Sequence, residues 1–196
     1  MGARDVEHPV VAAAVELRPL LRASRAYSED HACLSPEVLE AAGEVGLFRL
    51  FAPQEVGGLE VPPQVAAAAV MEVAAEDPAV AWYATNSAAA CITSAWLDET
   101  GRELLFAEPN RNFGLSAAMT GRATPVPGGF RLSGDWPLVT GVETAGWCAL
   151  NGFVHEGDEP RVVDGAPDQR LFLVPVGDVE IVPVWADAVA MRGTGS

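Results

Sequence analysis

The sequence predicts an α+β protein, with an all-helical N-terminal domain over residues 1–110 and a partial antiparallel β-barrel over residues 111–196. Two observations predict this class. Apolar residues recur at helical spacing through the first hundred residues. From Phe113 onward the pattern becomes strand-like, with Gly/Pro-rich turns between short runs. A chain of 196 residues is long enough to bury a core and to form one or two domains.

The first helical pattern runs from about Val6 to Tyr27. Pro19 lies inside it, and a proline removes a backbone donor and clashes with the preceding turn, so we expect a kink or two pieces. A second helix is expected to start at Ser35-Pro36-Glu37. There the Ser can cap, the Pro is tolerated in the first turn and the Glu suits the positive end. This helix is expected to stop near Gly46, before a loop that ends at Gly58.

Prolines also mark the next two helix starts. Pro62-Pro63 opens a helix that continues to about Ala75, and Asp77-Pro78 opens one that continues to about Ala95. The latter has small residues on nearly every face, which is typical of a helix surrounded by packed neighbours. A short helix from Asp98 to Phe106 then precedes a linker at residues 108–112.

The second half is expected to form strands separated by turns, with a polar, exposed loop at residues 155–169. Residues 179–184, and those from 189 onward, are candidate edge strands. The expected strands are Phe113–Ala117, Arg122–Val126, Phe130–Leu132, Trp136–Thr140, Trp147–Val154 and Arg170–Pro175.

Residues 128–141 (GGFRLSGDWPLVTG) carry the clearest local signal. Two alternating runs flank Ser133-Gly134, which predicts a β-hairpin with Gly134 in the turn. Trp136, Leu138 and Thr140 would share one face of its second strand. The pattern alone favours a half-buried strand whose Thr merely ends the ladder. The alternative is one wall of a site for a flat, mostly apolar ligand, with the Thr140 hydroxyl as a polar contact.

The charge balance limits the partners. The chain carries 12 basic and 27 acidic residues, a formal charge of −15, and all its basic residues are arginine. Such a charge argues against nucleic acid as a partner, although local donors would suffice for a phosphorylated cofactor. Without lysine, neither a P-loop lysine nor an internal Schiff base can form.

Other motifs are missing as well. The chain has no HExxH, CxxC or tight His/Asp cluster, so no metal is expected. Its three widely spaced cysteines suit reduced thiols better than disulfides. Neither a leader nor an apolar run of bilayer length is visible, so we expect a cytoplasmic protein without membrane contact. No tuned acid–base pair stands out, and the catalytic residues stay unknown.

Residues 128–141 resemble the middle-domain hairpin of the acyl-CoA dehydrogenase superfamily, where a Gly-Gly-aromatic-x-Leu-x-Gly turn leads into a flavin-contacting strand. Gly46-Leu47-Phe48 with Pro53 and Gly57-Gly58, and the MRGTGS run at residues 191–196, match further motifs in the same order. The resemblance covers nearly the whole chain but about the first half of a full-length member. It implies that the C-terminal helical bundle, which completes the flavin pocket and the oligomer, is absent.

The resemblance also implies flavin contacts. Leu138, Val139 and Thr140 match the strand that lies against the isoalloxazine ring, and the Thr140 hydroxyl would approach the N5 edge. Residues 113–117 match the first middle-domain strand, on the pyrimidine side of the ring. There the candidates are Phe113, Leu115 and Ser116, of which Ser116 would supply the hydroxyl contact.

Substrate contacts are expected from the small-residue helix, where Trp82 and Asn86 share one side and Ser87 follows. Buried polar groups need partners. For Asn86 and Ser87 the pattern favours bonds to neighbouring helices over contact with a substrate.

The resemblance implies a flavin-dependent oxidoreductase, with FAD in preference to FMN. It acts either by dehydrogenation of an acyl thioester (acyl-CoA) or by hydroxylation of an aromatic substrate. The short FGLSAAMTGRA stretch is more similar to the oxygenase branch, which receives reduced flavin from a separate reductase. The expected partners are a small-molecule substrate, a flavin reductase or an electron-transfer flavoprotein, and further copies in a homo-oligomer of the full-length form. The alternative is a catalytically inactive fragment that acts as a binding or assembly module.

Overall fold

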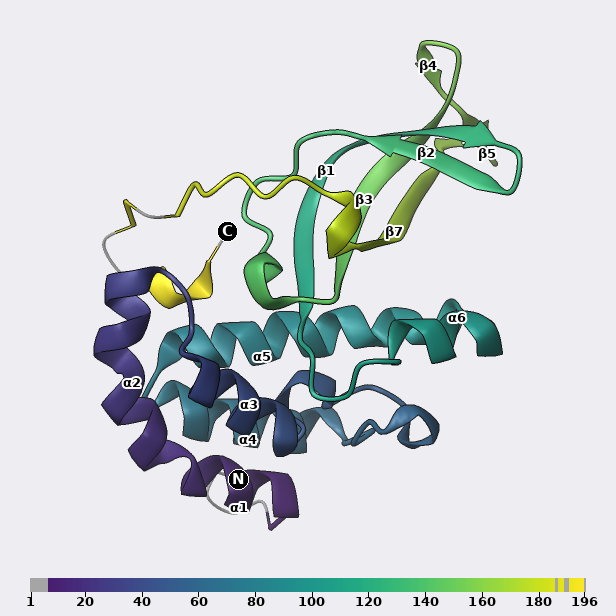
Figure 1. Cartoon of the computed structure of the whole chain (residues 1–196). Helices are drawn as coiled ribbons and strands as arrows, with labels where there is room; N and C mark the ends of the chain where they lie inside the picture. The colour runs from purple at the N-terminus through teal and green to yellow at the C-terminus, as the bar shows by residue number, and fades with distance from the viewer. Residues whose placement is uncertain (1–6, 186, 189–190, 196) are drawn as a thin grey trace.

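The structure, a computed structural model, describes residues 7–185, 187–188 and 191–195. In these ranges helices come first and strands follow, which confirms the α+β class (Figure 1). The helices are α1 (Pro9–Glu16), α2 (Arg18–His31), α3 (Pro36–Glu44), α4 (Pro63–Ala74), α5 (Pro78–Cys91) and α6 (Glu99–Leu105). The strands are β1 (Phe113–Val126), β2 (Gly129–Ser133), β3 (Trp147–Glu156), β4 (Glu159–Pro160), β5 (Val162–Val163), β6 (Ala166–Pro167) and β7 (Gln169–Pro175).

The helix starts follow local capping chemistry. The Ser35 hydroxyl accepts a bond from the Val38 N–H at 3.3 Å, and the Asp77 carboxylate accepts one from the Ala79 N–H at 2.9 Å. Both predicted starts are therefore confirmed. The first helical pattern forms two helices, as expected. Helix α1 ends at Glu16 and α2 begins at Arg18, so that Pro19 lies in the first turn of α2, where a proline is tolerated.

Helix α5 lies between the sheet and helices α1, α3 and α4 (Figure 1). Nine of its 14 residues are buried, and most of them are alanine or another small residue. Small side chains allow close approach on every face, so the prediction of a helix with packed neighbours is confirmed. The Ser87 hydroxyl joins three segments here, because it donates to the Phe48 carbonyl at 2.8 Å and accepts from the Phe113 N–H at 3.1 Å.

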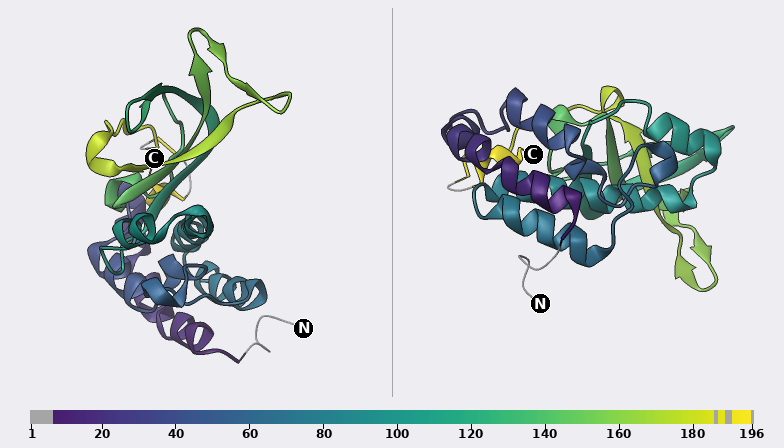
Figure 2. Two further views of the ribbon diagram at one scale, coloured as in Figure 1. Left: turned by 90° about the vertical axis from the view of Figure 1, so that its right-hand side faces the viewer. Right: turned by 90° about the horizontal axis from the view of Figure 1, so that it is seen from below.

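The sheet has the order β2-β1-β3-β4, with β7 also paired to β3. It curls over the end of the helical layer, as Figure 2 shows. β1 pairs antiparallel with β2 but parallel with β3, whereas β3 and β7 are antiparallel. The sheet is therefore mixed and not wholly antiparallel. The parallel pair forms because residues 134–146 carry the chain back to the end of the sheet where β1 started.

The predicted hairpin is wrong in its turn and in its second strand. The turn between β1 and β2 lies at Pro127-Gly128, where Gly128 has φ +85°. Gly134 has φ +155° but only follows the end of β2. The expected strand Trp136–Thr140 does not form, because Leu138 has φ +56°. Only Thr140 keeps a strand-like bridge, to Leu115 of β1.

A tertiary contact explains this irregular path. The Trp136 indole donates to the Asn151 carbonyl at 2.7 Å, which draws the segment onto the sheet. The ring occupies space left by Gly121, where a Cβ would lie 2.6 Å from the indole. Segment 134–139 therefore packs over β1 and β3 without extending the ladder of β2.

Three further expectations need correction. Residues 113–126 form one strand with an irregularity between Ser116 and Gly121, not two separate strands. Residues 179–184 form no strand. From residue 189 onward, 189–190 and 196 lie outside the described residues, and 191–195 contain a single 3₁₀ turn, η7 (Arg192–Thr194), instead of a strand.

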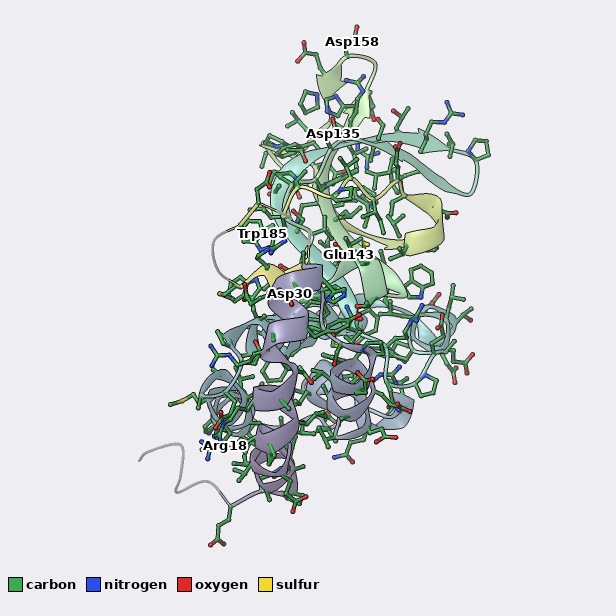
Figure 3. The ribbon with its side chains drawn as sticks, turned by 60° about the vertical axis from the view of Figure 1, so that its left-hand side comes forward. Arg18, Asp30, Asp135, Glu143, Asp158 and Trp185 are labelled. Atoms are coloured by element: carbon green, nitrogen blue, oxygen red, sulfur yellow. The ribbon has the colours of Figure 1, made fainter. Side chains whose placement is uncertain are left out.

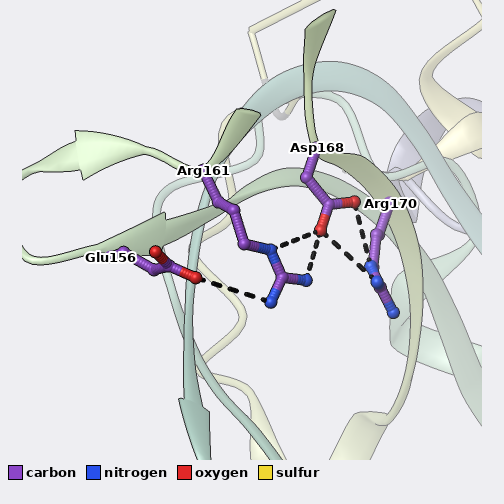
Figure 4. Close-up of polar contacts among 4 residues, drawn as sticks. All are labelled: Glu156, Arg161, Asp168 and Arg170. Carbon is purple, nitrogen blue, oxygen red and sulfur yellow. Dashed lines mark hydrogen bonds and ion pairs between the residues drawn. The ribbon is translucent and has the colours of Figure 1, made fainter. Parts of the chain in front are cut away.

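The expected loop at 155–169 is exposed but contains two tight hairpins, which extend from the sheet away from the helices (Figure 2). At the base of this arm Asp168 accepts bonds from Arg161 Nε at 2.9 Å and from Arg170 Nε at 3.1 Å (Figure 4). Glu156 lies 3.9 Å from the other side of the Arg161 guanidinium. Hydrogen bonds from Arg170 and Arg161 hold the pKa of the Asp168 carboxyl below its usual range.

This shift gives the arm a pH-dependent stability. Because the folded-state pKa is depressed, the carboxylate stabilises the fold above its unfolded pKa of about 4, and the contribution is lost as pH falls through the lower folded value. We expect Asp168→Asn to reduce the free energy of unfolding at neutral pH, and the difference from wild type to shrink below about pH 4. Urea unfolding across this range checks it. A difference that is independent of pH would contradict the assigned role.

Candidate functional site

The most distinctive polar contact between the helices and the sheet involves Thr140. Its hydroxyl accepts a hydrogen bond from the Trp82 indole N–H of α5 at 3.1 Å. Thr140 is 6% exposed, whereas Trp82 is 49% exposed. The hydroxyl therefore lies under the half-exposed indole ring, at the end of the connection from β2.

A buried polar network holds the corner formed by Thr140 and Gly141. Asn112 Nδ2 donates to the Gly141 carbonyl at 2.9 Å, and Thr144 Oγ1 donates to Asn112 Oδ1 at 3.0 Å. The Tyr83 hydroxyl lies 3.3 Å from Thr144 Oγ1 and, since the Thr144 hydrogen is used, donates to it. Burial raises the pKa of Tyr83 above its usual range, so this phenol stays protonated.

The end of the chain also contacts this corner. The Gly141 N–H donates to the Thr194 carbonyl at 3.1 Å, so a residue of the MRGTGS motif holds the backbone of the corner in place. Figure 3 shows Glu143 near the junction of the strands with the end of α2, where Asp30 lies. The corner is therefore fixed on both sides by contacts between segments that are distant in the sequence.

Leu138 precedes the corner with its side chain 52% exposed and its backbone at φ +56°. A positive φ is unfavourable for a branched side chain, and such outliers concentrate at binding and catalytic sites. The Ser116 hydroxyl donates to the Pro137 carbonyl at 2.9 Å and accepts from the Ala118 N–H at 3.3 Å. Ser116 therefore stabilises the backbone that presents Leu138.

Leu138 and Val139 also line a cavity of about 790 Å³ under the curled sheet. Most of its lining is apolar and includes Cys148, whose pKa is raised by burial to about 11. Asp135, Asp178 and Glu180 are the acidic residues that line it. A pocket of this size and polarity suits an apolar group, whereas its carboxylates repel phosphates.

The structure brings together several of the residues expected from the sequence. Trp82 and Leu115 both contact Thr140, and the two residues just before it, Leu138 and Val139, line the cavity. Asn86 is half-buried and donates from its amide to the Trp82 carbonyl at 2.8 Å.

Two expected residues lie elsewhere. Phe113 is buried with its ring edge against Phe106, at a centroid distance of 5.5 Å. Ser87 is completely buried, and its hydroxyl is bonded on both sides within the protein. These two residues join α5 to β1, which is the structural alternative that the pattern favoured for Ser87.

The site also contains residues that the sequence pattern does not indicate: Asn112, Thr144 and Tyr83. No spacing rule connects them, because their contacts span 32 and 61 residues. In the described part of the chain, no group of three His, Cys, Asp or Glu side chains could hold a metal ion. Within the same ranges, no helix combines the length and apolar character that crossing a bilayer requires.

The chain thus consists of a helical half and a curled mixed sheet, with the Thr140-Gly141 corner between them. Residues 12–103 match the model of the acyl-CoA dehydrogenase N-terminal domain. With the similarities below, this match makes the chain similar to the N-terminal half of acyl-CoA dehydrogenase-like proteins.

Among curated proteins the chain is similar to the oxygenase subunit HsaA, a flavin-dependent monooxygenase of Mycobacterium tuberculosis (strain ATCC 25618 / H37Rv). The identity is 31% over 195 residues, which cover 98% of this chain and 47% of that protein. A pigment production hydroxylase of Rhodococcus sp. (strain ATCC 21145) is 32% identical over 152 residues, 77% of this chain and 38% of that one.

Among solved structures, the 3-HSA hydroxylase from Rhodococcus sp. RHA1 matches with a TM-score of 0.84 at 28% identity. The match covers 96% of this chain and 47% of that one. The chain therefore spans about half the length, or less, of the relatives that it matches.

Proposed function

We propose that this chain forms the part of a flavin-dependent oxidoreductase that holds one side of the flavin ring, against the Thr140 corner. The observation that carries the proposal is the hydrogen bond between the buried Thr140 hydroxyl and the half-exposed Trp82 indole, with the exposed Leu138 two residues before Thr140 in the chain. A planar, mostly apolar ring with few polar edge atoms is the kind of ligand that such a surface suits.

The residues present fit this cofactor. Thr140 would face the edge of the ring, while Leu138 and the indole of Trp82 would exclude water from its faces. The acidic residues that line the cavity, Asp135 among them, make that cavity unsuitable for the phosphate tail, so the tail would lie outside it. When bound, the flavin supplies the redox chemistry, and this chain supplies position, polarity and exclusion of water.

We further propose the oxygenase type of reaction, hydroxylation of an aromatic substrate, over dehydrogenation of an acyl thioester. The relatives above bear the names of monooxygenases and hydroxylases, and the half-exposed Trp82 ring offers a face on which an aromatic substrate would stack. The proposal includes a reductase that delivers reduced flavin, a homo-oligomer of the complete protein, and FAD in preference to FMN.

The test is a titration of the chain with FMN and with FAD, followed by flavin fluorescence. We expect saturable binding of at least one flavin, weakened about three- to tenfold by Thr140→Val, because that variant keeps the shape but removes the hydroxyl that would bond to the ring, together with its bond from Trp82. Thr124→Val is the matched control, since Thr124 is an exposed strand residue of β1 and its loss should leave binding unchanged.

A non-enzymatic assembly module is the second candidate function. Ile92, Trp96 and Leu104 are 46%, 79% and 58% exposed, and large exposed apolar side chains favour association with another protein surface. If the folded chain took up neither flavin, the flavin proposal would be wrong and the assembly module would be favoured.

A further inference from the structure

The cavity under the curled sheet has apolar walls and the size of a small-molecule site. Its volume is about 790 Å³, within the range of sites that enclose small organic ligands. Leu132 of β2, Leu150 of β3 and Val174 of β7 form its inner wall. Most of the remaining lining comes from residues 133–139 and 178–184, two segments without strand structure. Such walls suit the body of an apolar ligand.

The charges around this cavity are all of one sign. Asp135, Asp178 and Glu180 line it and are exposed to solvent. Of the described residues that line it, none is Arg or His, and none of the ion pairs between described residues includes one of these three carboxylates. By contrast, Glu76 and Asp168 each have an arginine partner. Three unpaired carboxylates around one cavity create a negative potential that favours a cation.

Two further side chains in the lining favour the same kind of ligand. The Cys148 thiol is 1% exposed, and no hydrogen bond between described residues involves it, whereas the Cys91 thiol donates to a carbonyl at 3.4 Å. The buried end of the cavity therefore presents a soft, neutral and unpartnered group. The Trp136 N–H is already bonded to the Asn151 carbonyl, so this indole offers the cavity only its ring, and the face of such a ring attracts cations.

We propose that this cavity is a binding site for an apolar organic cation, whose aromatic or hydrocarbon body fills the cavity and whose protonated or quaternary nitrogen lies among Asp135, Asp178 and Glu180. A neutral guest would leave the carboxylates unpaired, and an anion would be repelled. The inference goes beyond the proposed function and does not depend on it, because it assumes no flavin and Thr140 does not line the cavity.

The test uses three probes that share a naphthalene ring and differ in charge: 1-naphthylmethylammonium, 1-naphthylmethanol and 1-naphthoate. Each is titrated by calorimetry into the full chain at about pH 7.5 and about 50 mM salt, where exposed charges are weakly screened. We expect the cation to bind at least about tenfold more tightly than the alcohol, and the carboxylate to show no saturable binding. Equal affinity for the cation and the alcohol would overturn the inference, as would the absence of binding by all three.

A triple variant removes the charges and keeps the shapes: Asp135→Asn, Asp178→Asn and Glu180→Gln combined. We expect it to weaken binding of the cation about five- to tenfold and to leave binding of the alcohol within about twofold, because only the cation uses the carboxylates. Circular dichroism checks that the variant is folded, and unchanged binding of the alcohol shows that the cavity is intact.

The matched control combines Glu40→Gln, Glu44→Gln and Glu103→Gln, at exposed positions of α3 and α6 that do not line the cavity. It changes the net charge by the same amount and should leave both affinities unchanged. An equal loss of cation binding in the two triple variants would show only a general attraction to an acidic chain, and the inference would be wrong.

NMR on ¹⁵N-labelled protein locates the bound cation. The Trp136 indole N–H signal should shift saturably, with the Kd found by calorimetry, whereas the signal of Trp96, which is 79% exposed and does not line the cavity, should stay. Saturable binding without a shift of Trp136 would place the probe elsewhere and overturn the inference. Flavin uptake without binding of the cation would contradict this inference alone, and binding of the cation without flavin uptake would contradict only the proposed function.

Discussion

Gly141→Ala is expected to lower the free energy of unfolding by about 3 kcal/mol and to weaken flavin binding, because it disturbs the corner that holds Thr140. Gly141 has φ +75°, a conformation that alanine adopts only with strain. An added Cβ would also lie 2.8 Å from Asn112 Nδ2 and 2.9 Å from the Tyr83 ring. Both neighbours belong to the buried network, so neither can move without breaking it. Thermal and urea unfolding measure the first effect, and titration with FAD and with FMN measures the second.

Gly128→Ala is the matched control, since Gly128 has φ +85° but no atom lies within 4 Å of its added Cβ. It bears the backbone strain alone, which we expect to cost about 1 kcal/mol with no effect on flavin binding. If the two variants lost similar stability, the close packing around Gly141 would not matter, and the corner would be more adaptable than its contacts indicate.

The parts of the fold that were predicted correctly are those that local chemistry determines. Ser35 and Asp77 each cap a helix whose first residue is proline, and such starts need no information from the rest of the chain. Residues 136–140 are predicted as a strand because their pattern alternates. They are irregular because the Trp136 indole reaches the Asn151 carbonyl and fills the space beside Gly121, a contact that alternation cannot encode.

The arm at 155–169 contains a turn signal that is visible in the sequence. Asp164 and Gly165 both have positive φ, as the tight turn between β5 and β6 requires, and an Asp-Gly pair is a strong indicator of that turn. The composition of residues 155–169 as a whole predicts only a polar loop and hides the short strands on either side of this pair. Turn chemistry would therefore have located this hairpin from the sequence.

Several residues of the candidate site are predictable from the sequence, but the contacts between them are not. Thr140 was found from its motif and Trp82 from the face of its helix, but the two are 58 residues apart, so their hydrogen bond could not be expected. The ligand contact expected of Ser116 stays a prediction, and in the structure its hydroxyl also donates to the Pro137 carbonyl and supports the neighbouring segment. A sequence motif therefore indicates which residues belong to the candidate site, whereas the hydrogen bonds that their side chains form within the protein are known only from the structure.

Arg49 is the buried cation on which the second large effect depends. It is 5% exposed, and its guanidinium donates to the carbonyls of Val56 at 3.0 Å, of Phe106 at 3.3 Å, and of Glu108. It also lies over the Phe106 ring, at 5.1 Å from the centroid. Burial lowers the pKa of Arg49, yet a guanidinium stays charged at any pH at which the protein folds. One side chain thus satisfies carbonyls from the loop after η2 (Leu47–Arg49) and from the end of α6.

Arg49→Met is therefore expected to lower the free energy of unfolding by about 3 kcal/mol, because Met fills the volume but leaves buried carbonyls without donors. For a chain of this length that corresponds to a fall in Tm of about 6–12 °C, measurable by calorimetry. Arg102→Met is the matched control, since Arg102 donates to a single carbonyl, that of Leu97 at 2.8 Å, and should cost about 1 kcal/mol or less. Arg49→Lys should fall between the two, because an ammonium keeps the charge but cannot reach all three acceptors. If Arg49→Met were no less stable than Arg102→Met, water would have replaced the guanidinium, and the junction between the loop and α6 would be open to solvent.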